Sequence, residues 1–262
     1  MNTNNFRGRK HPSVLGILAL CALATIGSLV FHRVGQGSGQ TGEKTSDEPV
    51  DARRALQMGV EDLRAGRVER ALTHLDRVAQ ASPESEPYLW QRGIAQYFAG
   101  KYEAGQKQFE SHRKVNPNDV ENATWHFLCV AARKDVKAAR AAMLPAPGDR
   151  RVPMEQLHAL YKGEGSRQAV EQAVDQFPKD SLAYRDARFY ADLYLGLLAH
   201  AEGKTEEAAR LLKAAAEVPD QNVMADVARL CRDRLVDTEA TGNATSKGET
   251  GQTNPAPTNG QR

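Results

Sequence analysis

Cysteine is scarce in this chain of 262 residues, which contains only Cys21, Cys129 and Cys231. An odd number of cysteines at wide spacing provides no disulfide framework and no paired Cys-x-x-Cys knuckle for a structural metal. Free cysteine is among the most buried residue types. We therefore predict that Cys129 and Cys231 are thiols in a core.

The sequence also lacks a dominant charge and the common signatures of catalysis. The formal net charge is +2, and residues 51–238 hold equal numbers of basic and acidic side chains. Nucleic-acid binding normally needs a concentrated basic face, so no nucleic acid is predicted as a partner. Neither a GxxxxGK[ST] loop nor a GxSxG turn occurs. We predict a protein that is not an enzyme and uses no cofactor.

Long segments without a charged residue are rare in this chain, and the apolar one lies near the N-terminus. Residues 13–31 carry no charge, and as a helix they would span roughly 28 Å, close to the thickness of a bilayer core. The preceding residues 1–12 are basic, which predicts that they stay in the cytoplasm. The sequence thus predicts a single-pass membrane protein with its soluble domain outside the cytoplasm, on the periplasmic side if bacterial. A cleaved signal or lipid attachment at Cys21 are the alternatives.

Two further segments have the composition of unstructured chain. Residues 32–50 are rich in Gly, Ser and Thr and are predicted to form a flexible linker. Residues 239–262 lack large apolar side chains and are predicted to be a disordered tail. Runs of β-branched residues are scarce between these segments, whereas Ala, Leu, Glu, Arg and Gln recur. Their propensities predict an all-α domain over residues 51–238.

Small and large residues recur in this domain with a fixed period. Gly59, Gly66 and Pro83 return 34 residues later as Gly93, Gly100 and Pro117. Each unit is predicted to be a helix, a turn with glycine, a second helix and a stop at proline. A glycine inside a helix allows another helix to approach, and we predict that large side chains on the facing turns fill the remaining space.

This pattern resembles the tetratricopeptide repeat family, on Trp90, Gly93, Tyr97, Phe109 and Pro117 of the second unit. The segment around Gly196 and Gly203 restores the pattern further along the chain. Two segments, 108–135 and 189–203, are also similar to a narrower group of tetratricopeptide proteins that is related distantly to new lipoprotein I. The resemblance implies an α-solenoid and an adaptor more than a catalyst.

The middle of the domain departs from the pattern. Phe127 stands where the period requires glycine, so residues 120–144 are predicted to form a degenerate third pair. Prolines interrupt residues 144–153, and residues 154–177 supply a fourth pair. A final amphipathic helix over 222–236 would cover the end of the fifth pair. We therefore expect about five helix pairs plus a capping helix, or about eleven helices.

Stacked helix pairs create a concave groove, which suits an extended peptide or a partner helix. The predicted function is a membrane-anchored scaffold or adaptor for a protein or peptide partner, and self-association into a homo-oligomer is left open. In the register of the repeat, the residues predicted to face the groove are Arg53, Gln57, Arg64, Gln91, Tyr97, Phe98, Glu121, Tyr190, Tyr194 and His200.

The alternative hypothesis is a metal-binding or enzymatic protein that uses His112, His126 and Cys129. Imidazole and thiolate are common partners in both kinds of site. His126 and Cys129 are three residues apart and could share a helical face, but spacing provides no further ligand. The acidic stretch near Asp119 could suggest calcium, whereas Asn118 or Asp119 after a proline is typical of a helix N-cap.

Overall fold

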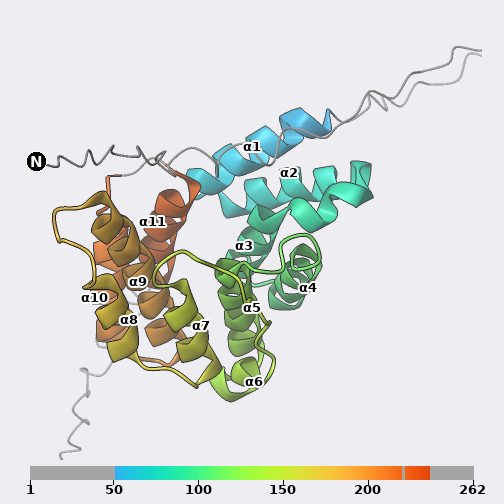
Figure 1. Cartoon of the computed structure of the whole chain (residues 1–262). Coiled ribbons are helices and arrows are strands. Elements are labelled where there is room, and N and C mark those ends of the chain that lie inside the picture. The colour runs from blue at the N-terminus through green and yellow to red at the C-terminus, as the bar shows by residue number, and fades with distance from the viewer. Residues whose placement is uncertain (1–50, 220–221, 237–262) are drawn as a thin grey trace, which may run out of the picture. The chain divides into compact units, whose positions relative to one another are not determined.

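The computed structural model describes residues 51–219 and 222–236, and within them all regular structure is helical. This confirms the predicted all-α class for the described part of the chain, which contains the predicted number of α-helices (Figure 1). The elements are α1 (Ala52–Arg64), α2 (Val68–Ala81), the 3-10 helix η1 (Pro83–Tyr88), α3 (Trp90–Phe98), α4 (Tyr102–His112), α5 (Val120–Arg133), α6 (Val136–Ala141), α7 (Met154–Lys162), α8 (Arg167–Val174), α9 (Leu182–Ala201), α10 (Thr205–Ala216) and α11 (Val223–Leu235).

The predicted membrane segment 13–31, the linker 32–50 and the tail 239–262 lie outside the described residues. None of the helices α1 to α11 is long and apolar enough to cross a membrane.

Short polar side chains begin several of these helices. The Asp119 carboxylate accepts from the backbone N–H of Glu121, which confirms one of the two predicted N-caps of α5. Asp51, Ser166 and Asn222 do the same for α1, α8 and α11. Each cap pairs a backbone N–H that has no partner inside its own helix.

Three helix pairs share one packing arrangement. Gly59, Gly93 and Gly196 are buried, each against a large side chain on the second helix of its own pair. A Cβ at Gly93 would lie 2.6 Å from Cζ of Phe109, and Gly59 and Gly196 face Leu75 and Leu212 in the same way. The predicted close approach of helices at the glycines is confirmed.

The turns of the same three pairs are equivalent in backbone conformation. Gly66, Gly100 and Gly203 have φ of 71°, 71° and 72°. This left-handed region is open to glycine at little cost and strained for other residues. The α1–α2, α3–α4 and α9–α10 pairs are therefore built on the same pair of glycines, seven residues apart.

The middle pairs are built differently. Phe127 occupies the position of the packed glycine, and its ring lies 4.9 Å from the ring of Tyr161 on α7. The second helix of the third pair, α6, is short and ends at Ala141, so the predicted pair is less extensive than its sequence segment. The fourth pair forms as predicted, with Gly163 at φ 87° ending α7.

The first helices of successive pairs contact one another, and the last helix of the described chain contacts the first. Contacts join α1 to α3, α3 to α5, α5 to α7, α7 to α9 and α9 to α11, and α11 also contacts α1. Arg64 on α1 and Asp226 on α11 form an ion pair of 2.6 Å. In an open stack each repeat contacts only its neighbours. Here α11 packs on α10 as the predicted cap and also joins the two ends, which the repeat pattern did not predict.

Candidate functional site: an acidic and aromatic pocket

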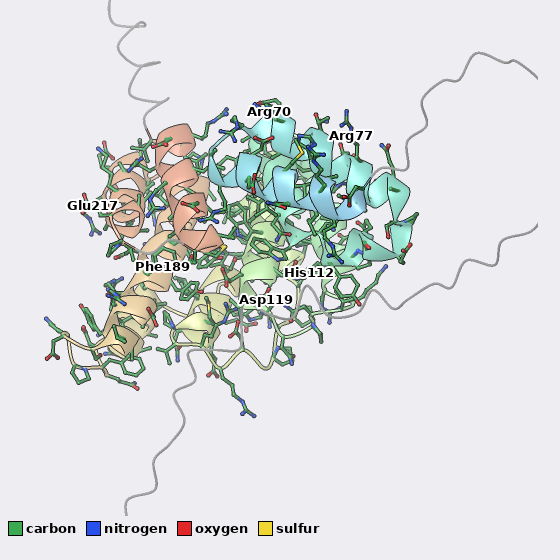
Figure 2. The ribbon with its side chains drawn as sticks, turned by 90° about the horizontal axis from the view of Figure 1, so that it is seen from above. Arg70, Arg77, His112, Asp119, Phe189 and Glu217 are labelled. Carbon is green, nitrogen blue, oxygen red and sulfur yellow. The ribbon has the colours of Figure 1, made fainter. Side chains whose placement is uncertain are left out.

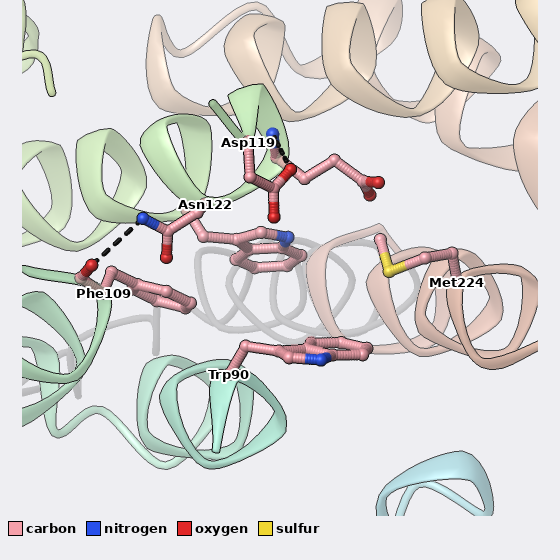
Figure 3. Close-up of a pocket in the computed structure, with 7 residues that line it drawn as sticks. Trp90, Phe109, Asp119, Asn122 and Met224 are labelled. Atoms are coloured by element: carbon pink, nitrogen blue, oxygen red, sulfur yellow. Dashed lines mark hydrogen bonds between the residues drawn. The ribbon is translucent and has the colours of Figure 1, made fainter. Parts of the chain in front are cut away.

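A cavity of about 80 Å³ lies where α3, α4 and α5 meet α11. In Figure 3, Trp90 lies across the pocket from Asn122 and Asp119, and Met224 of α11 closes one side. The lining residues are Trp90, Phe109, Asp119, Glu121, Asn122, Trp125 and Met224.

One wall of the pocket is supported by further aromatic rings. Trp125 is only 2% exposed, and its ring meets those of Tyr97 and Phe98 edge to face at 5.5 and 6.0 Å. Edge-to-face pairs at these distances are favourable because the positive ring edge meets the negative ring face. Tyr97 and Phe98 therefore hold Trp125 in place behind the pocket.

Two buried polar atoms in the lining have no hydrogen-bond partner among the described residues. Asn122 is 4% exposed, and its amide nitrogen donates to the carbonyl of Phe109 at 3.0 Å, while its Oδ1 is unpaired. The indole N–H of Trp125 is unpaired as well. Figure 3 shows the Asn122 oxygen pointing away from the Phe109 carbonyl. Buried polar groups are normally hydrogen-bonded, so such atoms indicate a site for water or a ligand.

The acidic side of the pocket is organised by Arg151, from the loop between α6 and α7. Its guanidinium forms ion pairs with Asp119 at 2.9 Å, with Asp149 at 2.6 Å and with Glu121. Asp149 also accepts from the backbone N–H of Val120 at 3.2 Å. One cation thus joins three carboxylates and fixes the loop over the start of α5.

Helix α9 completes this cluster from the other side. The hydroxyl of Tyr194 donates to Glu121 at 2.6 Å, and the Arg151 guanidinium lies 5.5 Å from the ring centre of Tyr190. Burial raises the pKa of Glu121 and of Asp119, while the guanidinium of Arg151 opposes this shift in both. For Asp149 the pKa is lowered, because hydrogen bonds from Arg151 and its positive charge outweigh the effect of burial.

The structure brings together only part of the predicted groove. Glu121, Tyr190 and Tyr194 meet around Arg151, and Glu121 also lines the pocket. Arg64 pairs with α11 at the junction of the two ends. The remaining residues are spread: Arg53 and Gln57 are exposed, Gln91, Phe98 and His200 are half-buried, and Tyr97 is in the core.

Several residues of the site could not be predicted from the repeat pattern. Arg151 and Asp149 belong to a loop, and Asp119, with which Arg151 pairs, is 32 residues before Arg151 in the chain. Met224 belongs to a helix that was predicted only as a cap. Trp125 was not among the residues predicted to face the groove, and its unpaired N–H depends on neighbours that only the tertiary structure defines.

The three residues of the alternative hypothesis have separate surroundings. His112 donates from Nδ1 to the carbonyl of Pro87 at 2.8 Å, and its Nε2 lies 3.9 Å from Asp119, which Figure 2 shows beside it. His126 faces Glu110 at 3.3 Å. Cys129 is buried, which raises the pKa of its thiol and keeps it protonated. Among residues 51–219 and 222–236, no group of three or more His, Cys, Asp and Glu side chains is arranged to hold a metal.

The sequence matches no protein-family model, and a search of curated proteins found no match.

Proposed function

We propose that this protein is a non-catalytic scaffold or adaptor, an α-solenoid of five tetratricopeptide-like pairs that recognises a protein partner. In this proposal residues 13–31 anchor it in the membrane, and the domain of residues 51–238 lies outside the cytoplasm. The observation that carries the proposal is the pocket on the side of the first helices, with its two unpaired buried polar atoms. The three glycine-spaced pairs support the repeat assignment.

Binding is favoured over catalysis by the types of residue in the lining. Among the residues that line the pocket there is no Ser, Cys, Lys or His, and the groups left for nucleophilic or acid–base chemistry are carboxylates. Its two carboxylates, Asp119 and Glu121, are both held by Arg151. Such an arrangement provides aromatic surface and fixed charge, which are the properties of a recognition site.

The contact between α1 and α11 limits what the partner can present. A groove open at both ends could accept a whole helix, whereas here α11 joins the first helices of the pairs into a closed series of contacts. The pocket of about 80 Å³ is also too small for an element of secondary structure. We therefore propose that the partner inserts a single side chain or a chain end between α3, α5 and α11.

Photo-crosslinking in cells of the source organism tests this proposal. Trp90→p-benzoylphenylalanine places an aromatic photoprobe in the lining of the pocket, in the full chain. Arg77→p-benzoylphenylalanine is the control, because Arg77 is exposed on α2, and its label lies at the edge of the molecule in Figure 2.

We expect a discrete crosslinked protein from position 90 that does not form from position 77. The proposal fails if both positions give the same products, or if position 90 gives none while the protein is folded and expressed.

A further inference from the structure

We infer that the pocket receives a lysine side chain of the partner protein, with its ammonium group directed at Asp119 and Glu121. This inference rests on the proposed function, because it takes the ligand to be part of a protein. It goes further by defining the chemistry that the partner must present.

The balance of charge around the pocket favours a cation. Three carboxylates, from Asp119, Glu121 and Asp149, surround the single guanidinium of Arg151. His112 is the other basic group near Asp119, but burial lowers its pKa and so disfavours a second positive charge. The carboxylates thus outnumber the cations. Burial raises the pKa of Asp119 and Glu121, and an incoming ammonium would favour the charged form of both.

The unpaired polar atoms match a ligand of this kind. A lysine ammonium has three donors and no acceptor. Asn122 offers an unpaired Oδ1, and the carboxylates of Asp119 and Glu121 line the same cavity. The indole N–H of Trp125 requires an acceptor, which a carbonyl of the partner or a bound water would supply. The ammonium itself would satisfy the unpaired oxygen of Asn122.

The apolar lining fits the rest of the side chain. Trp90, Phe109 and Trp125 provide aromatic faces, and indole is the ring that attracts cations most strongly. Met224 adds an adaptable apolar contact for the methylene groups. A cavity that holds a single water has a volume of about 10–15 Å³ by the same measure. The cavity of about 80 Å³ thus holds a short chain of heavy atoms.

The two tryptophans of the chain are Trp90 and Trp125, so its intrinsic tryptophan fluorescence reports on this pocket alone. The full chain in detergent is titrated with Nα-acetyl-lysine methylamide, whose side-chain ammonium is free. The matched control ligand is N-acetyl-norleucine methylamide, which has a similar shape and no charge. We expect the lysine compound to change the emission at a concentration about tenfold lower than the norleucine compound, because a desolvated ammonium gains cation–π and ionic contacts.

A substitution on α11 provides a second test without removing any charge of the cluster. Met224→Lys supplies an ammonium from the protein itself, at a half-buried position on the rim. We expect this variant to fold and to have lost its response to the lysine compound, whereas Met224→Leu keeps the response. The midpoint of thermal unfolding of both variants serves as the folding control.

The outcomes separate this inference from the proposed function. Equal response to the lysine and norleucine compounds overturns the inference, and so does an undiminished response in folded Met224→Lys. If the lysine compound does not bind while Trp90→p-benzoylphenylalanine still captures a partner, the lysine assignment falls and the adaptor proposal stands. If the compound binds as expected and no partner is captured, the pocket assignment stands and the adaptor proposal falls.

Discussion

The glycine-spaced pairs and the middle of the domain differ in the contacts that join their elements. In α1–α2, α3–α4 and α9–α10 a buried glycine lets a large side chain of the opposite helix pack against the backbone. Around α5 the glycine is replaced by Phe127, and the neighbouring elements are joined by ion pairs to Arg151. The glycine-spaced pairs are thus joined by apolar packing alone at this position, whereas the middle combines an aromatic contact with ion pairs at the start of α5.

This difference has a functional side. Close packing at Gly93 or Gly196 leaves no room for a ligand, because protein cores are packed to the density of organic crystals. The pocket lies where the glycine-spaced pair α3–α4 meets α5 and α11, and its two unpaired atoms both belong to α5. The regular pair thus supplies aromatic surface to the candidate site, and α5 supplies its polar groups.

The largest loss of stability is expected when the ion pairs of Arg151 are removed. Arg151→Met leaves Asp119, Glu121 and Asp149 without their common cation in a largely buried place, and we expect a loss of about 3 kcal/mol in the free energy of unfolding at pH 8. The loss should be smaller at pH 5, because the carboxylates can then be protonated. Denaturant unfolding at the two pH values measures both effects.

Arg150→Met is the matched control, since Arg150 precedes Arg151 in the same loop and is exposed. It should change stability by less than about 0.5 kcal/mol. Equal effects of the two substitutions would show that the cluster does not hold the middle together.

In the glycine-spaced pairs the expected cost arises from volume. Gly93→Leu forces a side chain into Phe109, whose ring atoms lie 2.6 to 3.0 Å from the position of a Cβ, and overpacking of this kind costs about 1–3 kcal/mol. We expect the upper end of this range, because Phe109 is 1% exposed and cannot move into solvent. Thermal unfolding measures the change.

Gly100→Ala separates volume from backbone strain in the same pair. A Cβ at Gly100 meets nothing within 4 Å, but φ is +71°. We expect a cost of about 1 kcal/mol from the left-handed backbone alone. If Gly93→Leu were no more costly than Gly100→Ala, the register of the repeat would be wrong.

The glycine-spaced part of the fold was predictable because its cause is local and periodic. Gly93 and Phe109 are in one helix pair, and the 34-residue period leads to the equivalent contact of Gly59 with Leu75. The end of α6 and the contact between α1 and α11 were not predictable in this way. Both depend on the tertiary packing, which no period in the sequence describes.

The candidate site was predictable only in its inward-facing part. Glu121, Tyr190 and Tyr194 follow from the register of the first helices, and the structure places all three at the cluster. Arg151 comes from a proline-interrupted loop with no periodic pattern, so its role arises from long-range contacts. A groove of ten residues was predicted, and a small pocket with a polar cluster beside it is found.

The smallest effect is expected at the junction of the two regions, where His126 of α5 faces Glu110 of α4. Burial lowers the pKa of His126 and of His112 from the ordinary value of 6.5, and their hydrogen bonds oppose the shift only in part. Below about pH 6.5 the unfolded chain therefore binds more protons than the folded chain. Stability that is present above this pH is lost as the pH falls toward the pKa values of the two histidines in the folded protein. Each histidine contributes at most about 1.4 kcal/mol per pH unit. We expect the unfolding free energy of the native sequence to fall between pH 7 and pH 6, and the double variant His112→Gln and His126→Gln to flatten this slope. An unchanged slope in the double variant would show that other groups cause the pH dependence and that His112 and His126 do not contribute to it.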